Sequence, residues 1–299
     1  MNDPLRILWL ESGDLYTIRR GVEAGRRLGV QVDSLEVLDL TFSAGVDAPH
    51  LAAGAQELTA VYDAVIVRSF MPFISEALTI ARLFREAGKV VVDTSLTDEG
   101  YAMSKMHDYI LLARAGVAVP RTYQCADPAQ AERYAEALGY PCVLKAVFGS
   151  EGRNVFKADT PAQFRRILWR RKPGEFMVQE FLPAEVDYRV ITVGYRALSV
   201  MVRRKPQPGE FRTNFDFKEE VTPLPTDEHP DMKELAERAA RTLRREFSGV
   251  DIRYRGDEPT ILEANRRPGF KGFEEATGFD VAGAFIEYVR NRCLAAQTD

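Results

Sequence analysis

The sequence predicts an α/β protein whose first lobe is a Rossmann-like parallel sheet and whose later part is antiparallel. In residues 1–95, short apolar runs alternate with segments whose apolar residues recur at helical spacing. From residue 187 onward, apolar runs come in adjacent pairs joined by glycine-bearing turns, as in antiparallel hairpins. Strands that alternate with helices imply a parallel sheet covered on both faces. At 299 residues, the chain is long enough for two or three lobes.

The first lobe is expected to span residues 1–95. Strands are predicted at residues 5–10, 32–40, 64–67 and 89–92, with helices at 15–28 and 74–87. The first strand is not followed by Gly-x-Gly-x-x-Gly, so this lobe is not predicted to bind a dinucleotide. Arg68 ends the third strand, at the carboxyl edge where ligands of such sheets bind. It is either a surface arginine paired with an acid or the anchor of a substrate carboxylate.

Composition and charge narrow the classes of function. The 40 basic and 44 acidic residues give a net charge of −4, which argues against broad nucleic-acid binding but leaves local basic clefts open. Three cysteines without metal-ligand spacing indicate free thiols in a reducing cytosol. The sequence has no signal-peptide pattern and no apolar run of membrane-spanning length, so a cytoplasmic protein without membrane contact is expected. The oligomeric state stays open, a homo-oligomer included.

Two strands near the C-terminus place oxygen-bearing side chains close together. They are predicted at residues 248–254 and 260–269. In an antiparallel pair Asp251 can face Glu263 and Asn265, which lie two apart and so on one face. Like charges this close raise one another's pKa unless a cation lies between them, so neutralising one is expected to stabilise the metal-free protein. Such ligands suit Mg²⁺ or Mn²⁺; the alternative is an exposed hairpin whose carboxylates face water.

Two lysines lie in contexts that suit phosphate binding. A predicted strand carrying Lys145 runs into a loop with Gly149 and Gly152, whose backbone N–H groups can turn inward as an anion cradle. Taken alone, this pattern is also that of an ordinary hairpin. Lys105 lies in the first turn of a helix predicted within residues 95–119, where an isolated lysine is usually solvated.

Several of these stretches resemble the ATP-grasp superfamily, and most closely its RimK-type (alpha-L-glutamate ligase-like) carboxylate–amine ligases. The resemblance rests on Gly-Val-Asp-Ile at 249–252, on Leu-Glu-Ala-Asn-x-x-Pro-Gly at 262–269, on the Lys145 strand with its glycine loop, and on Arg212-Thr213-Asn214, where the family has Arg-Ser-Asn. It extends from Leu5 to about Arg290. It implies an ATP-grasp fold with lobes at residues 1–95, 96–183 and 184–299.

The resemblance also implies a role for each matching residue. ATP phosphates would be bound by Lys105, Lys145 and the loop residues Gly149, Ser150 and Gly152. Adenine would lie at the connection between lobes, beside Gln179, Glu180, Phe181 and Leu182, with Asp187 also on the nucleotide. Mg²⁺ or Mn²⁺ would be held by Asp251, Glu263 and Asn265. A mobile loop at residues 203–214 would bring Arg212, Thr213 and Asn214 to the γ-phosphate, and Lys145, Arg212 and Asn214 would be the catalytic groups. Taken alone, Glu180 is also consistent with a solvated acid at the end of a strand.

Arginines around the predicted site indicate an anionic substrate. The candidates are Arg68, Arg203, Arg204, Arg266 and Arg267. Arg266 and Arg267 directly follow the predicted metal ligand Asn265, and two guanidinium groups there would suit a substrate rich in carboxylates, glutamate first. The alternative for this pair is to point outward and bind Glu274 or Glu275.

The predicted function is an ATP-dependent carboxylate–amine ligase. The resemblance implies that the γ-phosphoryl group of ATP converts a carboxylate to an acyl phosphate, which an amine attacks to form a peptide or amide bond. ADP and phosphate are released. The partners would be an amino acid and a carboxylate acceptor, which is a small molecule, a peptide or a protein C-terminus. Two alternatives stay open. One is an ATP-binding module without turnover, and the other is a kinase that binds ATP in the same way and phosphorylates a hydroxyl group.

Overall fold

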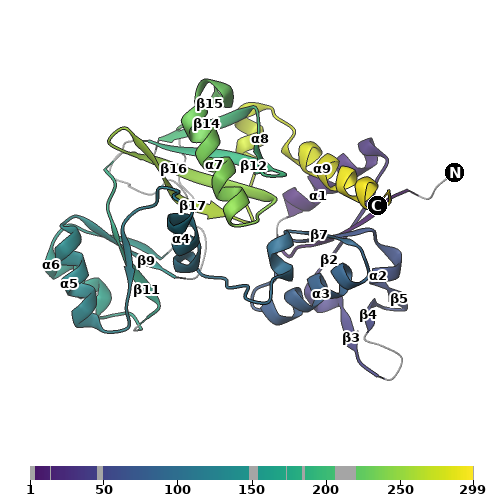
Figure 1. Cartoon of the computed structure of the whole chain (residues 1–299), viewed down its shortest axis with the longest axis horizontal. Coiled ribbons are helices and arrows are strands. Elements are labelled where there is room, and N and C mark those ends of the chain that lie inside the picture. The colour runs from purple at the N-terminus through teal and green to yellow at the C-terminus, as the bar shows by residue number, and fades with distance from the viewer. Residues whose placement is uncertain are drawn as a thin grey trace.

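Three lobes make up the part of the chain that the structure describes. The computed structural model describes residues 4–13, 15–45, 50–147, 154–172, 174–183, 186–205 and 220–298. Each lobe is built around its own β-sheet, and a small fourth sheet joins the first lobe (Figure 1). The main sheet of the first lobe is parallel and the sheets of the other two are antiparallel, so the predicted fold class is confirmed. No helix in these ranges is long and apolar enough to cross a membrane.

The first lobe follows the predicted alternation of strands and helices. Its elements are β1 (Arg6–Leu10), α1 (Leu15–Leu28), β2 (Gln31–Leu35), η1 (Val37–Asp39), β3 (Thr41–Ser43), β4 (His50–Ala53), β5 (Gln56–Glu57), α2 (Leu58–Val61), β6 (Ala64–Val67), α3 (Ile74–Glu86), β7 (Val90–Val92) and η2 (Thr94–Thr97). The parallel sheet has the order β2-β1-β6-β7. All four predicted strands are therefore present in one sheet.

The second strand is shorter than the sequence predicted. β2 ends at Leu35 instead of residue 40. The backbone N–H of Glu36 donates to the Asp39 carboxylate at 2.9 Å, and this local contact starts the η1 turn in place of further strand pairing. The small antiparallel sheet β3-β4-β5 follows and was not predicted.

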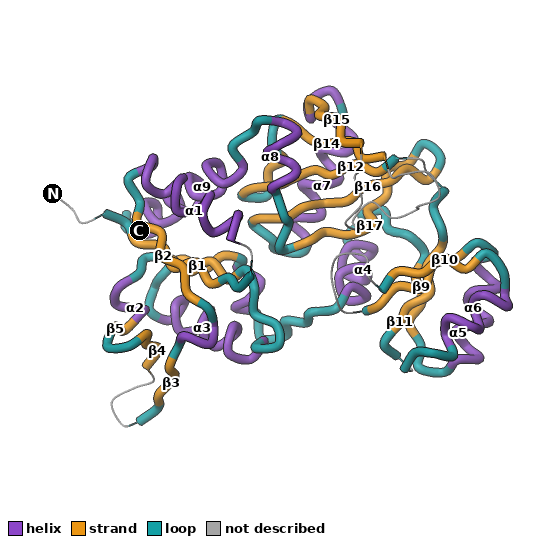
Figure 2. The backbone as a smooth tube through the Cα atoms, turned by 180° about the vertical axis from the view of Figure 1, so that it is seen from behind, coloured by secondary structure: helices purple, strands orange, loops and turns teal. Residues whose placement is uncertain are grey.

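The last helix of the chain, α9 (Val281–Ala296), packs on the first lobe. It lies beside α1, and the two cover one face of the parallel sheet while α3 covers the other (Figures 1 and 2). The rings of Trp9 on β1 and Phe285 on α9 meet edge to face, with centroids 5.8 Å apart. The first and third lobes thus share one apolar core, although the sequence placed α9 in the third lobe alone.

The central lobe is an antiparallel sheet with two helices on one face. Its elements are β8 (Thr122–Gln124), α5 (Pro128–Leu138), β9 (Cys142–Ala146), β10 (Val155–Ala158), α6 (Pro161–Leu168) and β11 (Phe176–Glu180), with strand order β10-β9-β11-β8. Helix α4 (Lys105–Arg114) precedes them and was expected in the same lobe. Its Leu112 instead lies in the core of the third lobe, with Leu235 and Ala239. α4 therefore stands between the central and third lobes (Figure 2).

The third lobe contains both predicted hairpins. Its elements are β12 (Asp187–Val193), β13 (Arg196–Ala197), β14 (Val200–Lys205), β15 (Glu220–Pro225), η3 (Thr226–Glu228), α7 (Pro230–Thr242), β16 (Phe247–Arg255), β17 (Glu258–Asn265) and α8 (Lys271–Thr277). The sheet has the order β15-β14-β12-β16-β17, which makes β17 an edge strand. Gly194 and Tyr195 both have positive φ, as a tight two-residue hairpin turn requires.

Two boundaries in this lobe differ from those predicted. The helix expected to reach residue 247 ends at Thr242, since Arg244 takes a positive φ and Phe247 already belongs to β16. The loop expected from residue 203 begins later, because Arg203 and Arg204 are paired within β14, between β12 and β15. Residues 206–219, with most of the predicted mobile loop, lie outside the described residues.

Candidate active site

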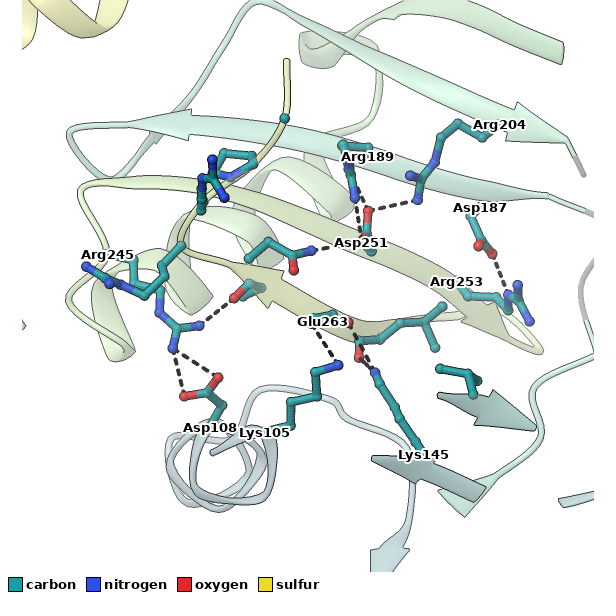
Figure 3. A pocket seen from close by; sticks show the side chains of 18 of the residues that line it. Lys105, Asp108, Lys145, Asp187, Arg189, Arg204, Arg245, Asp251, Arg253 and Glu263 are labelled. Atoms are coloured by element: carbon teal, nitrogen blue, oxygen red, sulfur yellow. Dashed lines mark hydrogen bonds and ion pairs between the residues drawn. The ribbon is translucent and has the colours of Figure 1, made fainter. Parts of the chain in front are cut away.

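A large cleft lies where the three lobes meet. Its volume is about 1310 Å³. It is lined by the turn after β1, the start of α4, strands β9 and β11, and the facing strands β12, β14, β16 and β17 (Figure 3). The predicted site residues that the structure describes line this cleft, with the exception of Arg203, which is exposed on β14.

The three predicted metal ligands lie together, as the hairpin register requires. Asp251 on β16 is directly opposite Glu263 on β17, and Asn265 is opposite Gly249. The side-chain amide of Asn265 donates to Asp251 Oδ2 at 3.1 Å. A bulge after Asp251 shifts the register of the remaining pairs but leaves these side chains adjacent.

The negative charge of Asp251, which lies opposite that of Glu263, is balanced by two arginines. Arg189 on β12 donates to both carboxylate oxygens, each at 2.8 Å, and Arg204 on β14 donates to Oδ1 at 2.8 Å. Asp251 is 1% exposed. The pairing of β12 with β16 places Arg189 opposite Asp251. The expectation that removal of a carboxylate would stabilise the protein is therefore not supported, since the carboxylate balances the buried Arg204 and the partly buried Arg189.

Glu263 is balanced by both predicted phosphate-binding lysines. Its Oε1 lies 3.4 Å from Nζ of Lys105 and its Oε2 lies 3.3 Å from Nζ of Lys145. Burial raises the pKa of Glu263, but the two lysines outweigh burial and the net pKa is lowered. Burial acts to lower the pKa of Lys145, yet Glu263 and Tyr109 bring it above its ordinary value, whereas burial dominates at Lys105 and lowers its pKa. Glu263 and Lys145 therefore form a fixed ion pair.

The predicted adenine-binding connection is ordered by its own contacts. The Glu180 carboxylate accepts hydrogen bonds from the backbone N–H of Arg121 at 3.0 Å, from its Nε at 2.8 Å and from Arg255 Nη1 at 3.2 Å. It is 9% exposed, so the alternative of a solvated strand-end acid is wrong. The backbone carbonyl of Leu182 accepts from Arg253 at 2.9 Å, and Arg253 also pairs with Asp187.

The arginines predicted to bind substrate connect the first and third lobes. Arg68 donates to the backbone carbonyls of Arg266 at 3.0 Å and Pro268 at 3.1 Å, and its guanidinium lies 4.5 Å from the ring centroid of Phe247. Burial lowers the pKa of Arg68 to about 10. Arg68 is thus buried instead of exposed, and among the described residues its guanidinium donates to backbone carbonyls of the other lobe and forms no ion pair with an acid.

Arg266 and Arg267 face the first lobe rather than the third. Arg266 donates to the backbone carbonyl of β6 residue Val67 at 3.2 Å, and its Nε lies 3.5 Å from Asp93 Oδ2. Arg267 Nε donates to Glu11 Oε1 at 2.7 Å. The alternative pairing of Arg266 and Arg267 with Glu274 or Glu275 is wrong: Glu274 instead accepts from Arg20 at 2.8 Å. The predicted loop residues Gly149, Ser150, Gly152, Arg212, Thr213 and Asn214 lie outside the described residues.

Comparison with known proteins decides the family. A model described as the RimK-like ATP-grasp domain matches residues 102–289. The chain belongs to the RimK-like ATP-grasp family. The probable alpha-L-glutamate ligase 2 of Hahella chejuensis is 30% identical, over 92% of this chain and 91% of the relative. The probable alpha-L-glutamate ligase of Serratia proteamaculans is 31% identical, over 94% and 93%.

The fold of this RimK-like protein is that of solved ATP-grasp ligases. The ATP-grasp ligase PsnB, in complex with a phosphomimetic variant of its minimal precursor, Mg and ADP, superposes with a TM-score of 0.74. The match covers 97% of this chain and 99% of PsnB at 21% sequence identity. The predicted ATP-grasp fold and the predicted RimK-type family are both confirmed.

Several residues at the site were not predicted from the sequence. They are Asp108, Tyr109, Arg189, Arg245 and Arg253. A signal existed for Arg189, which is two residues after Asp187 and so on the same face of the strand. The others depend on how α4 and the ends of β16 meet neighbouring lobes, which strand or helix periodicity does not encode.

Proposed function

We propose that this RimK-like protein is an ATP-dependent carboxylate–amine ligase. The observation that carries the proposal is the meeting of Lys105 and Lys145 with Glu263, directly across the hairpin from Asp251, in a cleft bounded by three lobes. Lys145 comes from β9 of the central lobe and Lys105 from α4, the helix between the central and third lobes. This arrangement suits a nucleotide whose phosphates must be held while one is transferred.

The charge of the cleft favours a polyanion. Nine arginines and lysines line the described part of the cleft, against five aspartates and glutamates. An excess of one sign in a cleft with low-dielectric walls attracts the opposite charge. A triphosphate supplies several negative charges at once, and a carboxylate substrate supplies the rest.

The donors also fit a divalent cation. Asp251, Glu263 and Asn265 lie next to one another across the hairpin, and each carries a side-chain oxygen. Within the described residues no group of three or more His, Cys, Asp and Glu side chains could hold a metal, so the amide is an essential part of this set. Oxygen donors that leave room for phosphate and water suit Mg²⁺, with Mn²⁺ as a substitute. When bound, the cation would neutralise phosphate charge.

The proposed reaction has two steps. A substrate carboxylate oxygen attacks the γ-phosphorus of ATP, and the bond to the β,γ-bridging oxygen breaks to give an acyl phosphate and ADP. The amine then attacks the acyl carbon, phosphate leaves with the electron pair of the C–O bond, and the amine loses a proton. Lys145 and Lys105 would hold and neutralise the phosphates, with Lys145 fixed as a cation by Glu263. Arg212 and Asn214 keep their proposed catalytic roles on the ground of family resemblance.

The proposed substrate is an acidic amino acid, with glutamate as the first candidate. It would supply either the amine or the carboxylate of the new bond. The relatives named above are probable alpha-L-glutamate ligases, and PsnB was solved with a precursor peptide. Arg267 is 39% exposed at the cleft, and Nη1 of Arg266 is buried without a hydrogen-bond partner among the described residues. These donors support a carboxylate ligand at the first-lobe end of the cleft. The acceptor is proposed to be a small molecule, a peptide or a protein C-terminus.

Product analysis tests the proposal. Purified protein is incubated with ATP, Mg²⁺ or Mn²⁺, single amino acids and carboxylate acceptors, and products are identified by mass spectrometry alongside phosphate release. A ligase gives phosphate and a condensed product, a kinase gives a phosphorylated product, and a binding module gives neither. Lys145→Met should abolish condensation, whereas the matched Lys172→Met, at an 84% exposed side chain, should not change it. A phosphorylated hydroxyl product without condensation would overturn the proposal.

A further inference from the structure

The edge of β17 is held by side chains from outside its sheet. Because β17 is an edge strand, the carbonyls of Leu262 and Ala264 point away from β16 and need other partners. Tyr109 on α4 donates its hydroxyl to the Leu262 carbonyl at 2.5 Å. Arg245 donates to the Ala264 carbonyl. These two carbonyls flank Glu263, so the backbone on both sides of this site carboxylate is fixed.

Tyr109 also contacts the phosphate-binding lysine of the central lobe. Its hydroxyl accepts a hydrogen bond from Nζ of Lys145 at 3.1 Å, and Nζ itself reaches the Leu262 carbonyl at 3.2 Å. The tyrosine is 4% exposed, so water does not compete for these contacts. One hydroxyl group therefore joins Lys145 to the strand that bears Glu263.

The same face of α4 carries three side chains that act on β17. Lys105, Asp108 and Tyr109 are three and four residues apart and so share one helix face. Lys105 pairs with Glu263, and Asp108 accepts from Arg245 at 2.9 and 3.0 Å. Helix α4 thus places Lys105 beside Glu263, and through Asp108 and Tyr109 it also orients Arg245 and Lys145. Figure 3 shows this arrangement for Lys105, Asp108 and Arg245.

We propose that Tyr109 is a positioning residue, which fixes Lys145 relative to Glu263 so that the lysine meets the β- and γ-phosphates. The inference rests on the proposed function, because it assigns Lys145 to the phosphates. Tyr109 is not among the residues that line the cleft. Without its hydroxyl, Lys145 keeps Glu263 and the Leu262 carbonyl but loses its third acceptor, and its ammonium group is free to shift. A shift of the Lys145 ammonium group would weaken binding of the β- and γ-phosphates and leave binding of the adenine end unaffected.

Calorimetric titration of two nucleotides tests this assignment. Mg·AMPPNP carries all three phosphate positions, whereas AMP carries adenine, ribose and the α-phosphate but lacks the β- and γ-phosphates that Lys145 is proposed to meet. Tyr109→Phe keeps the ring and should weaken Mg·AMPPNP about tenfold, as expected for loss of one hydrogen bond to a charged group. AMP affinity should stay within twofold of the parent. Tyr254→Phe is the matched control, since it removes a hydroxyl bonded to Asp231 at 2.6 Å away from the cleft, and both affinities should be unchanged.

Each other result has a definite meaning. Equal weakening of both nucleotides would show a merely structural role for Tyr109 and overturn the proposal, as would unchanged affinity for Mg·AMPPNP. Asp108→Asn provides a second variant on the same helix face; it loosens Arg245 and should also weaken Mg·AMPPNP more than AMP. If the parent protein binds neither nucleotide, the proposed function fails and the inference with it. If the parent binds both and Tyr109→Phe matches it, the inference alone fails.

Discussion

Asp251→Asn is predicted to destabilise the protein as well as to abolish turnover. Viewed from the hairpin alone, Asp251 and Glu263 repel each other, so neutralising one would relieve strain. The structure reverses this prediction, because Asp251 accepts two hydrogen bonds from Arg189 and one from Arg204. Substitution by asparagine replaces the carboxylate that these two guanidinium groups share with one neutral oxygen.

The magnitude follows from the burial of the groups involved. The side chains of Arg189 and Arg204 are 17% and 6% exposed, and that of Asp251 is 2% exposed. Removing one partner of a buried ion pair costs about 3–5 kcal/mol. Since asparagine still accepts one hydrogen bond, we expect the lower end, about 3 kcal/mol. At roughly 2 °C per kcal/mol for a chain of this size, Tm should fall by about 6 °C.

Thermal and urea unfolding, followed by circular dichroism without added metal, measure this change. Asp227→Asn is the matched control, because Asp227 is 75% exposed and pairs only with Lys233 among the described residues. An exposed pair contributes little, so its Tm should move by less than about 2 °C. Adding Arg204→Met to Asp251→Asn should recover part of the loss, since it removes one of the two cations that the carboxylate had balanced. A single variant as stable as the parent would refute the reasoning.

Two further predictions concern the contacts between the first and third lobes. Arg267→Ala removes the cation that faces the buried Glu11 carboxylate. In urea unfolding we expect the free energy of unfolding to fall by about 1–2 kcal/mol, a value discounted for the 39% exposure of Arg267. In kinetic assays we expect the KM for the proposed acidic substrate to rise more than tenfold, while the KM for ATP stays unchanged. Burial raises the pKa of Glu274, but Arg20 and other donors outweigh burial and lower it. The stability from this pair is therefore present above the unfolded-state pKa, about 4.3, and is lost as pH falls through the lower folded-state pKa. In urea titrations from pH 6 to pH 3, the parent should lose its advantage over Glu274→Gln as pH falls; a constant difference would contradict this.

Local patterns were sufficient for the main sheets and for the proximity of the three predicted metal ligands. Alternation of strands and helices predicted the parallel first lobe because each βαβ unit is complete within a short stretch of chain. The nearness of Asp251, Glu263 and Asn265 was predictable because a hairpin fixes its own register within a few residues. Some errors were at ends of elements, where a single side-chain contact, such as that of Asp39, stops a strand early. Others were the small β3-β4-β5 sheet and the lobes on which α4 and α9 pack.

The partners of these side chains were not predictable, because they come from distant parts of the chain. Arg189 reaches Asp251 only through the pairing of β12 with β16, 62 residues apart. Arg267 reaches Glu11 across 256 residues, after α9 has joined the first lobe to the third. Sequence patterns identify which side chains carry charge, whereas the packing of lobes decides which opposite charge each one meets.

The ion pairs of the cleft also bear on how it would receive a ligand. Each site carboxylate is balanced by two cations, so a bare metal ion would compete with those arginines and lysines for the carboxylates, and a bare phosphate would compete with the carboxylates for the cations. A metal–triphosphate complex brings both signs. It can give its cation to Asp251 and Glu263 and its phosphates to the lysines and arginines, so that partners are exchanged and no buried charge is left alone. The same balance that stabilises the cleft therefore favours the complex over either of its parts.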